Sequence, residues 1–185
     1  LYSSIYSVML ECLLGVLHNR SSKELKGWAD YLNSVQNAED GVYYDPALVG
    51  PAYEHIGNWN EGWGKHHLMG HIIIALARLG ATPKYPLRYL EAYHDPKYLE
   101  KWMESFDFSD DVWTASNYFM NLFTVLQYAR DYLNDQRAAT AVEIMTDWIL
   151  KKQNPKTGMW HSMPMDSLDQ LGKLKVVRAA YHFYP

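Results

Sequence analysis

The stretch QNPKTGMWH, residues 153–161, repeats the pattern of an earlier stretch, QNAEDGVYY, residues 36–44. Each reads glutamine, asparagine, three residues, glycine, one residue and an aromatic. A glutamine at a helix end can hydrogen-bond orphan backbone groups, and a glycine can take positive φ where the chain turns. The repeated stretch therefore predicts a staple between the end of one helix and the start of the next.

Helical patterns of two kinds fill most of the chain. Some segments are apolar nearly all round: residues 3–18, 66–79, 115–133 and 168–184. Others carry apolar residues at spacings of three and four: residues 22–36, 86–93, 96–106 and 137–152. A helix that is apolar on all sides must be covered on all sides, so this alternation predicts an all-α fold with inner and outer helices. An irregular helical bundle is the alternative.

A weaker third copy of the repeat runs from Trp102 to Trp113. Asp107 stands in the glutamine position and Asp111 in the glycine position. Trp102 and its counterpart Trp148 are 46 residues apart. A period in the forties suits one helical hairpin per repeat. The interval after the first copy is longer, which predicts an insertion in the loop 44–64.

The two full copies, YLNSVQNAEDGVY and WILKKQNPKTGMW, resemble the repeat of squalene cyclases and protein prenyltransferases, with one extra residue between glutamine and glycine. The resemblance implies that residues 1–185 form a single domain of three to four hairpins, part of an (α/α) toroid with a ligand in its central mouth. Because stacked repeats cover one another's apolar faces, we expect the remainder of a longer chain or a second copy to cover the open face.

Bulk composition excludes several classes of partner. The net charge is -4 and like charges do not run in blocks, so nucleic acid is not expected as a partner. No stretch reaches the ~20 apolar residues of a membrane-spanning helix. A single cysteine, Cys12, rules out a disulfide within the chain and leaves the compartment undetermined. No cofactor is expected.

The inserted loop mixes aromatic and polar side chains, as a site for a polar ligand does. Its candidate ligand-binding residues are His55, Trp59, Glu61 and Trp63. The tryptophan rings can stack on sugar rings, and the histidine can transfer protons. The alternative is a surface loop packed by its own aromatic residues.

Three histidines open the next helical segment. His66 and His67 are candidate catalytic residues, and His67 and His71 lie one turn apart, as helical metal ligands do. No aspartate or glutamate lies within that helix, so we expect no metal there. Histidines that line a pocket or fill the core are the preferred interpretation.

Asp110 and Asp111 are candidate ligand-binding residues. Squalene-hopene-type cyclases, which the repeat resembles, protonate an alkene with an acid from an Asp-x-Asp-Asp motif. Here Asp107 lies three residues before Asp110, so capping of the next helix is the preferred role. Prenyltransferases bind zinc through aspartate, cysteine and histidine. Cys12 has no such neighbours, so a zinc site is not expected.

Asn117, Tyr118, Arg178, Tyr181 and His182 resemble in type the catalytic residues of polysaccharide lyases on α/α toroids. In those enzymes asparagine or arginine neutralises a carboxylate while tyrosine or histidine moves protons. The alternative is an ion pair for Arg178 and packing between hairpins for Tyr181 and His182.

Three functions stay open on these grounds. The first is a terpenoid cyclase or prenyltransferase-like domain that acts on or binds an apolar ligand. The second is a carbohydrate-active toroid, a polysaccharide lyase or a glycoside hydrolase that takes an oligosaccharide. The third is a non-catalytic helical-repeat scaffold. An enzyme is favoured, with His66 or His67, Asn117 and a residue of the loop 53–63 expected in one pocket.

Overall fold

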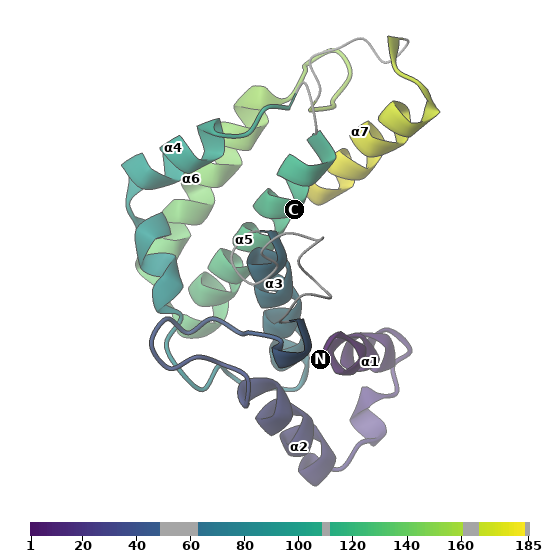
Figure 1. Ribbon diagram of the computed structural model, residues 1–185, viewed down its shortest axis with the longest axis vertical. Helices are drawn as coiled ribbons and strands as arrows, with labels where there is room; N and C mark the ends of the chain where they lie inside the picture. The colour runs from purple at the N-terminus through teal and green to yellow at the C-terminus, as the bar shows by residue number, and fades with distance from the viewer. Residues whose placement is uncertain (49–62, 109–111, 161–166, 184–185) are drawn as a thin grey trace. The chain divides into compact units, whose positions relative to one another are not determined.

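A computed structural model describes residues 1–48, 63–108, 112–160 and 167–183 of this chain (Figure 1). Within these ranges the regular structure is helical, and the strand-like pairing is the isolated bridge between Gln36 and Tyr43. The predicted all-α fold is therefore confirmed. Closure into a toroid stays a prediction.

The chain divides into two compact units, Leu1–Tyr89 and Leu90–Pro185. Each unit is described by itself below. The single domain over residues 1–185 stays a prediction.

The first unit contains three α-helices and two short 3-10 helices. They are α1 (Tyr2–Leu13), η1 (Leu17–Asn19), α2 (Ser22–Asn33), η2 (Pro46–Leu48) and α3 (Trp63–Arg78). Helix α1 packs on α3. Ile5 and Val8 of α1 are buried, as are most apolar side chains of α3. Helix α1 ends at Leu13, earlier than the pattern predicted, because the chain turns at Gly15.

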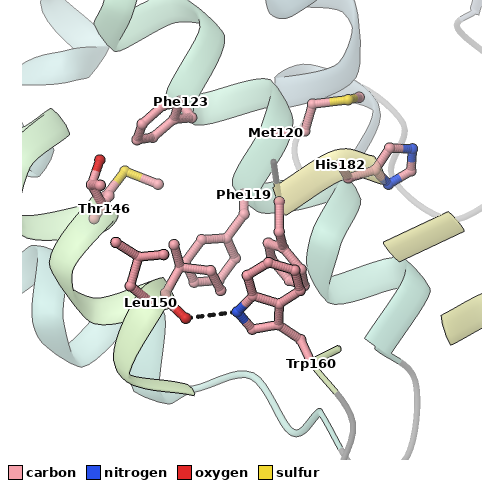
Figure 2. A pocket seen from close by; sticks show the side chains of 10 residues that line it. Phe119, Met120, Phe123, Thr146, Leu150, Trp160 and His182 are labelled. Carbon is pink, nitrogen blue, oxygen red and sulfur yellow. Dashed lines mark hydrogen bonds between the residues drawn. The ribbon is translucent and has the colours of Figure 1, made fainter. Parts of the chain in front are cut away.

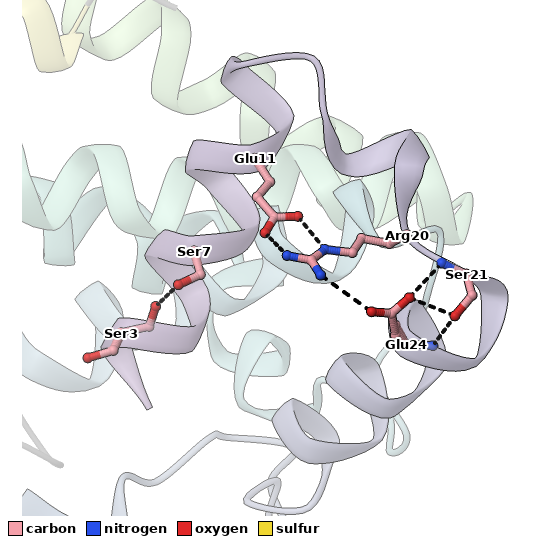
Figure 3. A network of polar contacts seen from close by, with 6 residues as sticks. All are labelled: Ser3, Ser7, Glu11, Arg20, Ser21 and Glu24. Atoms are coloured by element: carbon pink, nitrogen blue, oxygen red, sulfur yellow. Dashed lines mark hydrogen bonds and ion pairs between the residues drawn. The ribbon is translucent and has the colours of Figure 1, made fainter.

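Helix α2 begins with a capping box, which joins its start to the end of α1. Ser21 accepts a hydrogen bond from the backbone N–H of Glu24, and the Glu24 carboxylate accepts one from the N–H of Ser21. Arg20 contacts both Glu11 of α1 and Glu24 (Figure 3). Two orphan N–H groups of the first turn are satisfied in this way. Because they are exposed, the ion pairs of Arg20 contribute little to the free energy of unfolding.

The second unit is built around one long central helix. Its elements are η4 (Arg88–His94), which begins at the boundary, α4 (Pro96–Glu104), α5 (Val112–Leu133), α6 (Gln136–Lys152) and α7 (Gln170–Phe183). Helix α5 contacts both α6 and α7, and α4 lies beside α6 (Figure 1). Within this unit α5 is thus the central helix, and the predicted division into inner and outer helices stays a prediction.

The predicted separation of the helical segments 86–93 and 96–106 is confirmed, and the first of them differs in type. Asp95 caps α4 by accepting a hydrogen bond from the N–H of Lys97 at 3.0 Å, and Pro96 opens the helix. The segment 86–93, expected as an α-helix, is instead the 3-10 helix η4. Short connectors between helices often take this tighter form.

The two full copies of the repeat adopt the same hydrogen-bonded turn. The backbone N–H of Gly41 donates to the Asn37 carbonyl at 3.0 Å, and the N–H of Asn37 donates to the Val42 carbonyl at 2.8 Å. The Gln36 side-chain amide donates to the Gly41 carbonyl at 2.9 Å. Gly41 has φ of 76°, a conformation in which residues with a Cβ are strained.

The second copy repeats each of these bonds. Gly158 donates to the Asn154 carbonyl at 2.8 Å, and Asn154 donates to the Met159 carbonyl at 2.9 Å. The Gln153 amide donates to the Gly158 carbonyl at 2.8 Å, and Gly158 has φ of 71°. The predicted turn, with its glutamine bond and its glycine at positive φ, is therefore present in both copies, whereas the link to the start of the next helix stays a prediction. The third copy includes residues 109–111, which lie outside the described residues.

The aromatic that ends each copy is buried and reaches back to the helix before it. The Tyr43 hydroxyl donates to the Asn33 side chain, on the last residue of α2, at 2.8 Å. Trp160 Nε1 donates to the Ile149 carbonyl, in the last turn of α6, at 2.6 Å. Carbonyls in a last turn lack intrahelical donors, so Trp160 caps α6 while it fills the core.

Candidate functional site

A pocket with mostly apolar walls lies within the second unit (Figure 2). It has a volume of about 100 Å³ and is partly open to solvent. Three elements and the repeat turn line it: Phe119, Met120 and Phe123 of α5; Met145, Thr146, Ile149 and Leu150 of α6; Trp160; and His182 and Phe183 of α7.

Trp160, the aromatic that ends the second repeat, forms one wall of this pocket. Trp160 is 1% exposed, held to α6 by its bond to Ile149, and its ring centroid lies 5.1 Å from that of Phe183. Phe119 and Met145 are also buried, whereas Leu150 is exposed. Trp160 therefore forms a buried part of the pocket wall, and Leu150 forms an exposed part.

His182 is the one predicted catalytic residue that lines the pocket, where Figure 2 shows it at one edge. Its Nδ1 lies 2.8 Å from the Ser116 hydroxyl oxygen. Ser116 is fully buried and also donates to the Trp113 carbonyl at 2.7 Å. Burial lowers the pKa of His182, and the nearby charge of Arg178 lowers it further. The imidazole is thus neutral near pH 7.

The other predicted residues of this unit make contacts elsewhere. Asn117 is buried and donates to the Trp113 carbonyl at 2.8 Å, and the ring of Tyr118 packs on Phe106. The Arg178 guanidinium lies over the Trp113 ring, 5.0 Å from its centroid. Trp113 is therefore contacted by both the Asn117 amide and the Arg178 guanidinium.

Tyr181 is 80% exposed, and its ring centroid lies 6.1 Å from that of His182. Of the five residues compared with a lyase, His182 alone is among those that line the pocket. The lyase assignment stays a prediction.

The histidines of α3 form a partly buried cluster with α1 in the first unit. His67 Nδ1 lies 2.8 Å from the Tyr2 hydroxyl, and His71 Nδ1 lies 2.7 Å from the His67 carbonyl. The rings of His67 and His71 have centroids 4.1 Å apart. His66 is buried at the edge of the Tyr89 ring. These contacts favour the core interpretation of the three histidines.

Burial makes these imidazoles hard to protonate. It lowers the pKa of His66 to about 4, with a smaller contribution from the charge of Lys65. It lowers the pKa of His67 to about 4, with a smaller contribution from His71. Among the described residues, no group of three or more metal-ligating side chains comes together.

Stability should therefore fall as the pH is lowered through the range from 6.5 to 4. In this range the unfolded chain protonates His66 and the folded chain does not. At pH 5 the cost for His66 alone is about 2 kcal/mol. Urea unfolding at pH 7.5 and pH 5 measures it.

The matched variants for this pH dependence are His66→Leu and His18→Phe. His66→Leu should remove about 2 kcal/mol of the loss of stability at pH 5 and leave the share of His67, whose pKa is also lowered to about 4. His18→Phe, which removes an exposed histidine, should keep the whole loss seen in the parent chain. An unchanged pH dependence in His66→Leu would contradict the assignment to His66.

Several predicted ligand-binding residues lie outside the described residues. They are His55, Trp59, Glu61, Asp110 and Asp111. Trp63 begins α3, but its side chain is also outside the description. The expected pocket that joins His66 or His67 to Asn117 spans the two units and stays a prediction.

Most of the pocket was not foreseen from the sequence. Met120, Phe123, Met145 and Thr146 belong to ordinary helical patterns, and nothing in their spacing marks them. The useful signal was Trp160, since the repeat places this aromatic against α6 in a fixed way.

Comparisons with known proteins add no assignment: no protein-family model, curated protein or solved structure matches this chain. Among the described helices, none has the length and apolar character needed to cross a membrane.

Proposed function

We propose that this chain is a helical-repeat domain that binds a small, largely apolar molecule in the pocket between α5, α6 and α7. The observation that carries the proposal is the lining of the pocket, where aromatic rings, methionines and aliphatic side chains surround very few polar atoms. Binding sites for small molecules share this character, with a few placed polar groups that orient the ligand.

The size of the pocket indicates the size of the group that it can take. An apolar cavity of about 150 Å³ holds benzene, so about 100 Å³ holds a somewhat smaller group. Because the pocket is partly open to solvent, a tail of the ligand can extend outside it. One end of an isoprenoid chain fits these dimensions better than a polycyclic product.

The resemblance of the repeat supports the same class of ligand. Squalene cyclases and protein prenyltransferases, whose repeat the two staples resemble, act on isoprenoid chains. A carbohydrate-active toroid would instead need polar groups to meet sugar hydroxyls, and the walls of this pocket offer few. The function as a terpenoid-binding domain therefore ranks above the function as a lyase or hydrolase.

Thermal unfolding with added ligands tests the proposal. At ten times its dissociation constant, geraniol should raise the melting temperature by about 3 to 6 °C, because binding to the folded state alone stabilises it. Neutral and uronate oligosaccharides should produce no shift. Stabilisation by an oligosaccharide instead would favour the carbohydrate-active alternative, and stabilisation by neither class would favour a scaffold.

Thr146→Phe should block the pocket, because its ring would occupy the space between α5 and α6. Thr140→Phe is the matched control. Each threonine donates to the carbonyl four residues earlier on α6, but Thr140 is exposed and distant from the pocket lining. We expect geraniol affinity to fall at least about tenfold in Thr146→Phe and to stay unchanged in Thr140→Phe. Equal affinities in the two variants would place the ligand elsewhere.

A further inference from the structure

Helix α7 carries a second set of apolar side chains, apart from the buried ones that pack on α5. Leu174 and Val177 are each 52% exposed, and Tyr181 is 80% exposed. Residues at spacings of three and four share one face of a helix, so these three side chains form a continuous stripe, called the α7 stripe below. Leu171, also exposed, extends it by one turn. Exposed apolar side chains that gather in this way indicate an interaction surface.

Two cations border the α7 stripe, one on each side. Lys173 directly precedes Leu174, and Arg178 directly follows Val177. Successive residues of an α-helix are about 100° apart, so the two cations lie on opposite sides of the stripe. Both are exposed, and the ion pairs of lysine and arginine in the described part of the chain involve other residues. The helix contains no aspartate or glutamate, whereas the whole chain has a net charge of -4.

This arrangement is that of one helix of a coiled coil. Leu174, Val177 and Tyr181 occupy successive a, d and a positions of the heptad pattern, and Lys173 and Arg178 occupy the adjoining g and e positions. Side chains at e and g form ion pairs with the partner helix and thereby select the partner. A helix that fits the α7 stripe therefore needs apolar residues at a and d, and aspartate or glutamate at e and g.

A second copy of this chain fits the α7 stripe less well. Two α7 helices side by side would bring Lys173 and Arg178 of one copy against the same cations of the other, and like charges at e and g oppose pairing. Helix α1 also has an exposed apolar face, but its single acidic residue, Glu11, is already paired with Arg20. Neither helix of a second copy offers acidic side chains to both cations.

A lipid surface also fits less well than a helix. Helices that lie in a membrane surface bury a broad apolar face that carries tryptophan, phenylalanine and leucine. The α7 stripe is narrow between Leu174 and Tyr181, because Lys173 and Arg178 border it, and the exposed face of α7 contains no tryptophan or phenylalanine. A narrow a and d stripe is the geometry of helix pairing.

We propose that the α7 stripe pairs with an amphipathic helix of another protein, one that carries aspartate or glutamate on both sides of its apolar residues. The charges of Lys173 and Arg178 select this partner, and the three apolar side chains supply the buried contact. None of these five residues is among those that line the pocket, so the interaction is separate from the binding of a small molecule.

The test titrates two synthetic peptides against the full chain and follows binding by fluorescence anisotropy. Each peptide is about 21 residues long, so that it can form a helix, and has leucine at a and d. One has glutamate at e and g, and the other has lysine there. The glutamate peptide should bind at least about tenfold more tightly, and its affinity should fall as salt is added, because salt screens exposed ion pairs.

Charge reversal on α7 should reverse this preference. The double variant Lys173→Glu, Arg178→Glu should bind the lysine peptide more tightly than the glutamate peptide, a gain that loss of folding cannot produce. Tyr181→Ser should weaken binding of the glutamate peptide at least about threefold, since it removes apolar contact area. Lys23→Glu, the same exchange at an exposed lysine of α2, should leave the preference unchanged.

Three results would overturn the proposal. The first is equal binding of the two peptides by the parent chain, or binding of neither. The second is binding to phosphatidylglycerol vesicles with no preference between the peptides, which would make the α7 stripe a lipid-binding face. The third is self-association of the parent chain in analytical ultracentrifugation that Tyr181→Ser abolishes, which would assign the stripe to a second copy.

Discussion

Gly41→Ala is expected to lower the free energy of unfolding by about 3 to 5 kcal/mol. A Cβ at this position would lie 2.1 Å from the Pro86 carbonyl oxygen and 2.9 Å from Leu87 Cα. Both are backbone atoms, so no side chain can rotate away. The φ of 76° adds the strain that any residue with a Cβ meets there.

Alanine variants at two other glycines serve as controls that separate the cost of the steric clash from the cost of the positive φ. Gly80 has φ of 66° with nothing within 4 Å of an added Cβ, so Gly80→Ala should cost only about 1 kcal/mol. Gly27 lies within α2 and also has open space around it, so Gly27→Ala should stabilise the helix by about 0.5 to 1 kcal/mol. Urea unfolding followed by circular dichroism gives all three values.

Equal losses in Gly41→Ala and Gly80→Ala would show that the approach of Pro86 to the first repeat turn is not a constraint. The expected difference follows from how the first repeat is held. Gln36 accepts a hydrogen bond from the Tyr85 N–H at 2.8 Å and donates to the Tyr85 carbonyl at 2.9 Å. The turn at Gly41 and the segment after α3 thus meet at van der Waals contact, which leaves no room for a methyl group.

The repeat allowed much of this architecture to be predicted, because its constraints are local. Gln36 and Gly41 lie five residues apart, and their bond depends on little besides the turn itself. The same pattern at Gln153 and Gly158 could be inferred from the first copy. Helix caps such as Ser21 with Glu24 are equally local.

The pocket could not be predicted, because it depends on contacts between residues far apart in sequence. His182 was selected for its chemistry, but its partner Ser116 lies 66 residues earlier and gave no signal. The histidines of α3 show the opposite case. Their close spacing suggested chemistry, whereas the contact of His67 with Tyr2 of α1 and its lowered pKa favour a packing role that periodicity alone cannot show.

The sequence also could not predict what covers the apolar faces of α1 and α7, because that depends on long-range packing. Helices α1 and α7 were expected to be covered on all sides, yet Leu10 and Leu13 of α1 and Leu171 and Leu174 of α7 are exposed. Apolar periodicity indicates which residues avoid water in the complete assembly, but it does not identify the element that covers them. The expected cover, more of the chain or a second copy, stays a prediction.

Trp160→Ala should lower the free energy of unfolding by about 3 to 5 kcal/mol, through loss of a buried aromatic and the cavity left behind. Trp160 is 1% exposed and contacts the ring of Phe183. The variant also removes the donor from the Ile149 carbonyl, at the end of α6 where intrahelical donors run out. The second repeat would thus lose both its core residue and its helix cap.

Trp160→Phe shows how much of this loss of stability comes from packing and how much from capping of α6. A phenyl ring fills much of the indole volume but cannot donate to Ile149, so about 1 to 3 kcal/mol should be lost. Trp28→Ala is the control, since Trp28 is half-buried on α2 and lies beside Arg20 at the surface. If Trp160→Ala cost no more than Trp28→Ala, the aromatic of the repeat would not be the anchor of the turn. The pocket wall would then have to be held by α5, α6 and α7 without the repeat turn, and Trp160→Phe should leave geraniol binding unchanged.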